Sequence, residues 1–133
     1  MPASLDSRDY IGGAQIFGGF GTDHKLGRFD GTNVAAVIET AEFKRPDGRR
    51  TYISGVRPFV DGTATVQVGY RSLPTDMVTW SDAASTESDT GIAPFHIDTR
   101  YARARVNMAA GVGWTKAQGI DDAPELIKAA GLR

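Results

Sequence analysis

Hydrophobic and polar residues alternate with a period of two along the middle of the chain. The clearest run is residues 64–71, in which Ala64, Val66, Val68 and Tyr70 share one side and polar or small residues share the other. A β-strand with one buried and one solvated face produces this alternation. The middle of the chain therefore predicts a sheet with one wet face.

A second alternating run covers residues 100–108, in which small or apolar residues alternate with Tyr101, Arg103, Arg105 and an asparagine. We call the side formed by Tyr101, Arg103 and Arg105 the arginine face. The run predicts a strand with a core face and a charged face.

Two less regular stretches, residues 34–43 and 51–60, also have strand character. In the second, a strict period of two places Ile53 and Val56 on opposite faces. Pro58 marks an edge or a bulge there, because proline cannot donate a ladder hydrogen bond.

Three Asp-Gly pairs, at residues 30–31, 47–48 and 61–62, lie between runs with strand character. Such pairs favour the tight turns of β-hairpins, so their spacing predicts a β-meander. The sequence Arg45-Pro46-Asp47-Gly48 is the most specific, because Pro presets the φ of a type I turn and Gly accepts a positive φ.

The two ends of the chain differ from its middle. Residues 1–21 are rich in glycine with interspersed apolar residues and predict an arm. Residues 122–125 resemble a capping box with proline in the first turn, and Gly131 suits a C-cap, so residues 122–133 predict a short helical tail. The prediction is an all-β fold, an antiparallel β-sandwich of about seven or eight strands over residues 22–121.

The composition of the 133 residues fits one soluble, turn-rich domain. Fifteen Lys and Arg against 16 Asp and Glu give a formal charge of -1, which removes the general electrostatic argument for binding nucleic acid or anionic membranes. The absence of cysteine excludes disulfides and thiolate metal sites. No apolar run approaches the roughly 20 residues that span a bilayer, and the first residues do not resemble a signal peptide, so we expect a cytosol-like compartment.

Motifs for cofactor chemistry are weak. Residues 18–25 superficially resemble a phosphate loop, but Lys25 follows His24 rather than glycine, so a turn or arm is favoured. His24 and His96 each have an aspartate nearby, yet two histidines without ligand spacing do not predict a metal site. We expect no metal and no cofactor.

Catalytic constellations are also missing. No serine lies in a nucleophile elbow, and Glu39 and Glu42 are expected on opposite faces of a strand, so they form no acid pair. We expect no enzymatic activity.

The arginine face has three open interpretations: a solvated sheet face with ion pairs inside the sheet, an interface with a protein partner, or contact with a DNA backbone. Arg57 and Arg71 are expected on neighbouring strands, and arms of this kind gain order on a neighbouring subunit. The candidate subunit interface consists of Arg57, Arg71, Tyr101, Arg103, Arg105, Phe17 and Phe20.

Residues 36–43, 48–62, 100–106 and 113–121 carry a resemblance to a known group of proteins. Over roughly residues 20–121 the chain resembles the C-terminal portion of tailed-phage virion proteins, of the tail-tube, nozzle and packaged-DNA-stabilising kind found in short-tailed phages. The resemblance implies a non-enzymatic structural subunit of a virion, in the tail or the head-to-tail connection. It implies assembly in the bacterial host cytoplasm, with copies of itself and other virion proteins as partners, and neither membrane contact nor sequence-specific binding to nucleic acid.

Two other classes of function remain open. A carbohydrate-binding or adhesin-like β-sandwich would use Trp80, Trp114 and Tyr101 as a stacking platform, which requires the three rings to be exposed on one face. A small hydrolase or lyase ranks last, because no catalytic constellation supports it.

Overall fold

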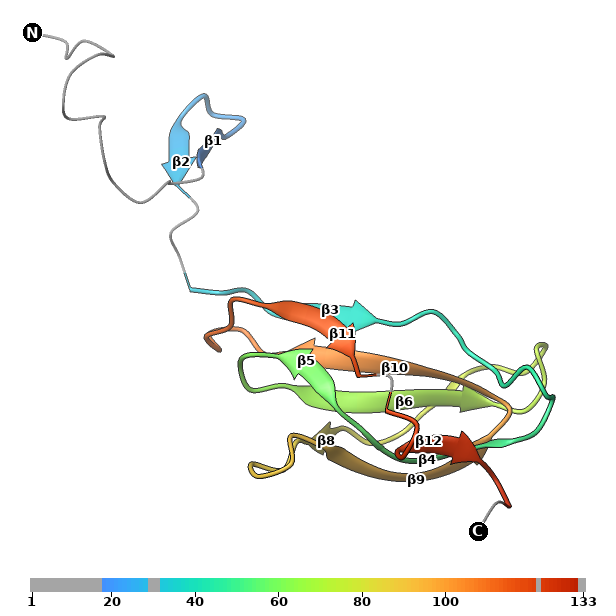
Figure 1. Cartoon of the computed structure of the whole chain (residues 1–133). Coiled ribbons are helices and arrows are strands. Elements are labelled where there is room, and N and C mark those ends of the chain that lie inside the picture. Colours follow the sequence, from blue (N-terminus) through green and yellow to red (C-terminus); the bar gives the residue numbers. More distant parts are fainter. Residues whose placement is uncertain (1–17, 29–31, 122, 132–133) are drawn as a thin grey trace, which may run out of the picture. The chain divides into compact units, whose positions relative to one another are not determined.

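The computed structural model describes residues 18–28, 32–121 and 123–131, and the chain divides into two compact units, Met1–Thr32 and Asn33–Arg133. The described residues contain twelve β-strands and no helix (Figure 1). All strand pairs are antiparallel. The all-β antiparallel class predicted from the sequence is confirmed. No stretch of the described residues forms a helix long and apolar enough to cross a membrane.

The first unit contains one hairpin, formed by β1 (Gly18–Phe20) and β2 (Leu26–Arg28). The N–H of Gly21 donates to the carbonyl of Lys25 across its turn, at 2.9 Å. The stretch that superficially resembles a phosphate loop is thus a β-turn between two short strands. Residues 1–17 of the predicted arm lie outside the described residues.

The second unit contains a five-stranded sheet in the order β3-β10-β6-β7, with β8 also pairing with β6. Its strands are β3 (Ala36–Glu39), β6 (Thr65–Arg71), β7 (Thr79–Trp80), β8 (Ala84–Ser85) and β10 (Tyr101–Met108). Strand β10 pairs with both β3 and β6, so it is a central strand.

The other strands of this unit form a three-stranded sheet, β12-β4-β9, and a two-stranded pair, β11-β5. Their bounds are β4 (Thr51–Val56), β5 (Pro58–Val60), β9 (Ala93–Thr99), β11 (Ala117–Ile120) and β12 (Ile127–Ala129). The total exceeds the predicted seven or eight strands, because strands of two to four residues are too short to show a period.

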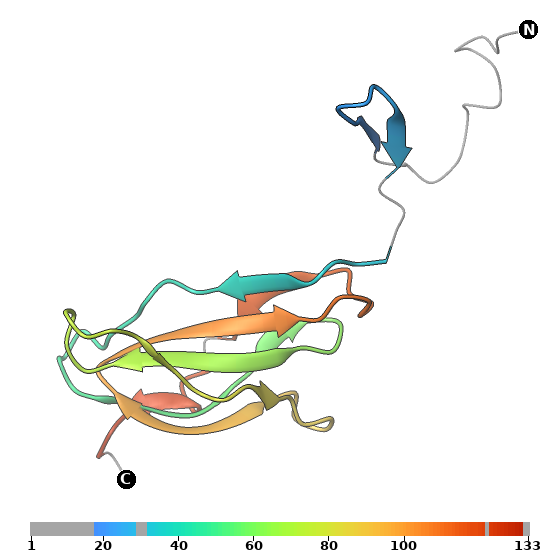
Figure 2. The same cartoon turned by 180° about the vertical axis from the view of Figure 1, so that it is seen from behind.

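The main hydrophobic core joins the five-stranded and three-stranded sheets, which run side by side in both views (Figures 1 and 2). Its buried members are Ile53, Val56, Ala93 and Phe95 from one sheet and Val66, Val68, Ala102 and Ala104 from the other. A second cluster consists of Ala64, Val106 and Met108. The alternation predicted for residues 64–71 and 100–108 is confirmed for Ala64, Val66 and Val68 and for the even-numbered residues 102–108, which enter these clusters, whereas Tyr70 is only partly buried and belongs to neither.

The predicted β-meander is wrong. The turn at residues 47–48 leads from β3 to β4, and the turn at residues 61–62 leads from β5 to β6, so both join strands of different sheets. The local turn chemistry is nevertheless as expected, since the N–H of Gly48 donates to the carbonyl of Arg45 and Gly48 has a φ of 70°. The third Asp-Gly pair, at residues 30–31, lies outside the described residues.

Ile53 and Val56 were expected on opposite faces of one strand, and this prediction is also wrong. Both side chains are buried in the main core. The β4–β9 register shifts between Ile53 and Gly55, where one residue of β4 lies opposite two of β9, so strict alternation does not hold through this part of the strand pair.

The predicted C-terminal helix is not present in the described residues 123–131. The N–H groups of Leu126 and Ile127 donate to the carbonyl of Ala123, which makes one turn, and the chain then continues as β12. Strand β12 pairs with β4 and buries Ala129. A helix this short would be only marginally stable, even with favourable capping residues. Pairing with the free edge of β4 therefore stabilises this segment more than a helix would.

Asp61 ties the β5–β6 connection to the segment before β11. Its carboxylate accepts the N–H groups of Thr115 and Lys116, at 2.8 and 3.0 Å, and the hydroxyl of Thr115. The Thr115 hydroxyl and the N–H groups of Lys116 and Thr115 lower the pKa of Asp61 from 3.8 to about 2. The ionised form is therefore favoured in the folded state.

Replacing Ile53, which is 1% exposed at the centre of the main core, tests the packing of the two sheets. We expect Ile53→Ala to lower the free energy of unfolding by about 2–5 kcal/mol, through lost burial and the cavity left behind. Urea unfolding measures the change. Val37→Ala is the control, because Val37 is 60% exposed and its truncation should change stability little; equal losses would contradict the assigned core.

The contribution of Asp61 to stability should depend on pH. Because the pKa of Asp61 is depressed in the folded state, its stabilising effect is complete well above 3.8 and is lost as the pH falls toward about 2. The difference in thermal midpoint between the wild type and Asp61→Asn should shrink over that range. Asp89→Asn, which removes a carboxylate with no hydrogen bond among the described residues, should show no such trend; a constant Asp61→Asn difference would refute the role of the carboxylate.

Candidate functional site on the arginine face

The arginine face lies on the outer side of β10, opposite the side that enters the core. Its three side chains are half-buried and alternate with the buried Ala102 and Ala104. The strand register places them next to residues of both neighbouring strands: Arg105 opposite Glu39 of β3, Arg103 opposite Gly69 of β6 and Tyr101 opposite Arg71 of β6.

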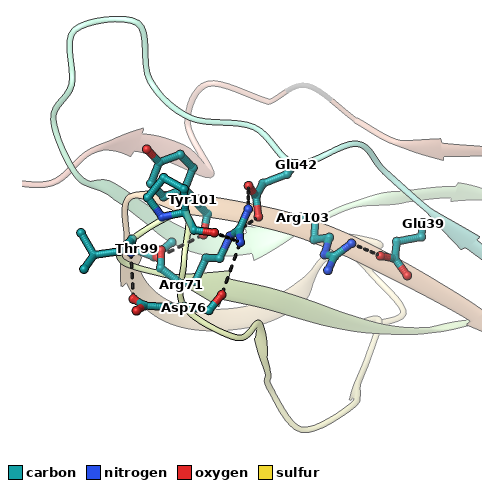
Figure 3. A network of polar contacts seen from close by, with 9 residues as sticks. Glu39, Glu42, Arg71, Asp76, Thr99, Tyr101 and Arg103 are labelled. Carbon is teal, nitrogen blue, oxygen red and sulfur yellow. Dashed lines mark hydrogen bonds and ion pairs between the residues drawn. The ribbon is translucent and has the colours of Figure 1, made fainter.

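Glu39 is paired with both arginines of this face. Its carboxylate lies 2.8 Å from Arg103 Nη1 and 3.0 Å from Arg105 Nη2, and all three side chains are about one-third exposed. Figure 3 shows Arg103 directed at Glu39. One carboxylate thus lies between two guanidinium groups, which leaves one net positive charge at this point.

Arg71 forms a second centre with Glu42. The guanidinium donates to both carboxylate oxygens, at 2.6 and 2.8 Å, and also to the carbonyls of Pro74 and Asp76 in the β6–β7 loop (Figure 3). The hydrogen bonds from Arg71 lower the pKa of Glu42. Such a bidentate pair orients the arginine as well as neutralising it.

Glu42 reaches this face because the β3 segment contains one extra residue. Glu39 and Glu42 were expected on opposite strand faces, and that prediction is wrong. Ile38 pairs with Val106, and Phe43 pairs with Ala102. Between these two pairs the β3 segment has four residues and β10 has three. This irregularity returns Glu42 to the side of Glu39, and the period of the sequence gave no sign of it.

Trp80 lies over β6 and packs against the arginines. A Cβ placed on Gly69 would come within 3.0 Å of two carbon atoms of the indole, so the ring occupies the space that a side chain there would take. The guanidinium carbon of Arg105 is 3.7 Å from the ring centroid and that of Arg103 is 5.3 Å away. These are cation–π contacts, which hold both arginines close to the sheet.

The three arginines of this sheet, Arg71, Arg103 and Arg105, therefore each have a carboxylate partner, either Glu39 of β3 or Glu42 in the segment that follows β3. Of the three interpretations left open by the sequence, this arrangement matches the first, a solvated sheet face whose arginines form ion pairs within their own chain. It can present a surface of mixed charge in which the indole of Trp80 is partly covered by Arg103 and Arg105. A role of these residues in a subunit interface stays a prediction.

The remaining candidate interface residues lie elsewhere. Arg57 lies at the break between β4 and β5, pairs with Asp121 at 3.0 Å, and so is not on a strand beside Arg71. Phe20 is in the hairpin of the first unit and is 80% exposed. Phe17 lies outside the described residues.

The structure does not bring the proposed stacking platform together. Trp114 packs against Val106 and Met108, which belong to the inner side of β10. Tyr101 and Trp80 belong to the outer side, where Trp80 is covered by the arginines. The three aromatic rings therefore share no face.

The two histidines make ordinary contacts. Tyr52 Oη and His96 Nδ1 are 2.9 Å apart, and His24 takes part in the β1–β2 turn through a backbone N–H that donates to Gly21. In the described part of the chain, no group of three or more His, Cys, Asp or Glu side chains is placed to hold a metal ion.

No protein-family model and no curated protein matches this chain.

The position of the Trp80 indole against the sheet should require glycine at position 69, because a side chain there would occupy the same space. We expect Gly69→Ala to lift the ring from the sheet and to destabilise the protein by about 1–3 kcal/mol, the usual effect of overpacking. In a Trp114→Phe background, acrylamide should quench the fluorescence of Trp80 more strongly. Gly113→Ala is the matched control, because a Cβ there meets no atom within 4 Å; unchanged quenching in Gly69→Ala would contradict the stacked position.

Proposed function

We propose that this protein is a non-enzymatic structural subunit of a phage or phage-like virion, in the tail or the head-to-tail connection. In this proposal the second unit is a β-sandwich and the first unit is an attachment segment. The partners are copies of the same chain and other virion proteins, and assembly takes place in the bacterial host cytoplasm.

The observation that carries the proposal is the apolar surface of the β1–β2 hairpin. Phe20 and Leu26 are cross-strand partners, and they are 80% and 67% exposed. A two-stranded hairpin alone is marginally stable in water, and large exposed apolar side chains mark interaction surfaces. Binding to a neighbouring subunit would cover both side chains and stabilise the hairpin.

The second unit offers surfaces of the kind a structural subunit needs. Strand β3 ends the strand order of its sheet, and among the described residues no further strand pairs with its outer side. Val34 and Val37, in and beside this strand, are 78% and 60% exposed. An edge strand of this kind can pair with a strand of another chain.

The chemistry of the arginine face also fits a structural role. Arg103 and Arg105 are both paired with Glu39, and the neighbouring Arg71 is paired with Glu42, so each guanidinium group contacts a carboxylate of its own chain. Paired charges of this kind support recognition and register between subunits more than they support catalysis. The resemblance to tailed-phage virion proteins supplies the choice of particle.

The proposal is tested by following the protein into particles produced by the genome that encodes it. We expect the wild type to be recovered in purified particles and Phe20→Ser/Leu26→Ser to be largely absent from them, because the hairpin loses its apolar contact. Quantitative mass spectrometry of the particles measures incorporation, and thermal unfolding shows that the variant still folds.

Leu73→Ser/Met77→Ser is the control, since it removes two exposed apolar side chains from the β6–β7 loop and should leave incorporation unchanged. Normal incorporation of the hairpin variant would refute the role of β1–β2. Absence of the wild-type protein from particles would refute the virion assignment itself.

A further inference from the structure

A basic hollow lies between the β3–β4 connection and the β9–β10 turn. It has a volume of about 180 Å³, and its walls include Lys44, Arg45, Arg49, Arg100 and Tyr101. We call it the basic pocket. It meets the arginine face at Tyr101 but draws its cations from the two loops.

The register of β4 explains why these loops meet. Thr51, the first residue of β4, pairs with Thr99, the last residue of β9, so residues 44–50 and Arg100 come to the same end of the sheet. Arg50 strengthens the junction by donating to the carboxylate of Asp98 at 2.7 Å and to its carbonyl at 2.8 Å.

The wall formed by the β3–β4 connection is held in one shape by its own hydrogen bonds. The Asp47 carboxylate accepts the N–H of Arg49 at 3.1 Å and the side chain of Arg45 at 3.2 Å. The positive φ of Gly48 completes the turn. The backbone that carries Arg49 is therefore held in a defined turn, which lowers the entropy cost of ordering this loop around a ligand.

The charges of this pocket are not balanced. Arg45 is paired with Asp47, whereas Lys44, Arg49 and Arg100 form no ion pair with any carboxylate of the described residues. Every arginine of the arginine face, by contrast, has a partner. Three cations that form no ion pair among the described residues surround one hollow, with Asp47 as the nearby carboxylate, and they make a local anion-attracting site on a chain with a formal charge of -1.

We propose that the basic pocket binds a phosphate group. A phosphate offers several strong acceptor oxygens and, as a monoester or inorganic ion, up to two negative charges, so it can engage several cations at once. A single carboxylate has one charge and would leave most of the pocket unneutralised. The volume leaves room for a phosphate group and bridging water, since one water takes about 30 Å³.

The phosphate group can belong to a small anion or to the backbone of duplex DNA. Both would present negatively charged phosphate oxygens to the cations of the pocket. Backbone contact of this kind has no sequence preference. The inference does not depend on the virion assignment, because it concerns the purified chain.

The test is calorimetric titration of the full chain at low salt with pyrophosphate and, separately, with a short DNA duplex. We expect Arg49→Gln/Arg100→Gln to weaken binding about tenfold or more and to reduce the salt slope for the duplex by about two. Lys116→Gln/Lys128→Gln removes the same charge from exposed positions outside the pocket and should have a much smaller effect. Amide shifts in NMR spectra should concentrate at Gly48, Arg49 and Arg100.

The outcomes separate the sources and can overturn the proposal. Binding of both ligands, with pyrophosphate displacing DNA, supports a pocket for any phosphate group, and binding of the duplex alone supports a backbone site. Equal losses in the two double variants, or no binding of either ligand, would overturn the proposal. Tighter binding of polyglutamate than of either phosphate ligand would also overturn it, because the occupant would then be an acidic protein surface.

Discussion

Strand β10 couples the hydrophobic core to the charged surface of the second unit. Its even-numbered side chains from Ala102 to Met108 are buried, and Tyr101, Arg103 and Arg105 on the other side form the arginine face. A shift of its register by one residue would expose the core residues and bury two guanidinium groups. The same pairing with β3 and β6 therefore determines which residues fill the interior and which carboxylates meet the arginines.

The sequence was informative where the structure is regular over many residues. The alternation in β6 and β10 predicted both strands and their buried sides, because seven or eight residues are enough to display a period of two. The turn at Gly48 was predictable for a similar reason, since its chemistry is local. What each strand pairs with was not predictable, because partner choice depends on residues far apart in the chain.

Irregularities account for the remaining differences. The register shift before Gly55 and the extra residue before Phe43 each interrupt the regular pairing of two strands, and neither can be read from the pattern of residue types. The tail that begins at Ala123 has helix signals, yet it forms a strand on β4 because that edge is available to it. The sequence also could not show which arginines form ion pairs and which, like Arg49 and Arg100, do not. Pairing depends on which carboxylates the fold brings near each arginine.

The order of strands also has a consequence for how the chain reaches this fold. Ile53 of β4 pairs with Ile97 and with Ile127, so the inner strand of the smaller sheet acquires its two partners from segments far along the chain. Such a topology has a high contact order, and long loops must close before their contacts can stabilise anything. Folding is therefore expected to be slow, and during synthesis the β4 segment remains an unpaired, aggregation-prone strand until both later segments have emerged.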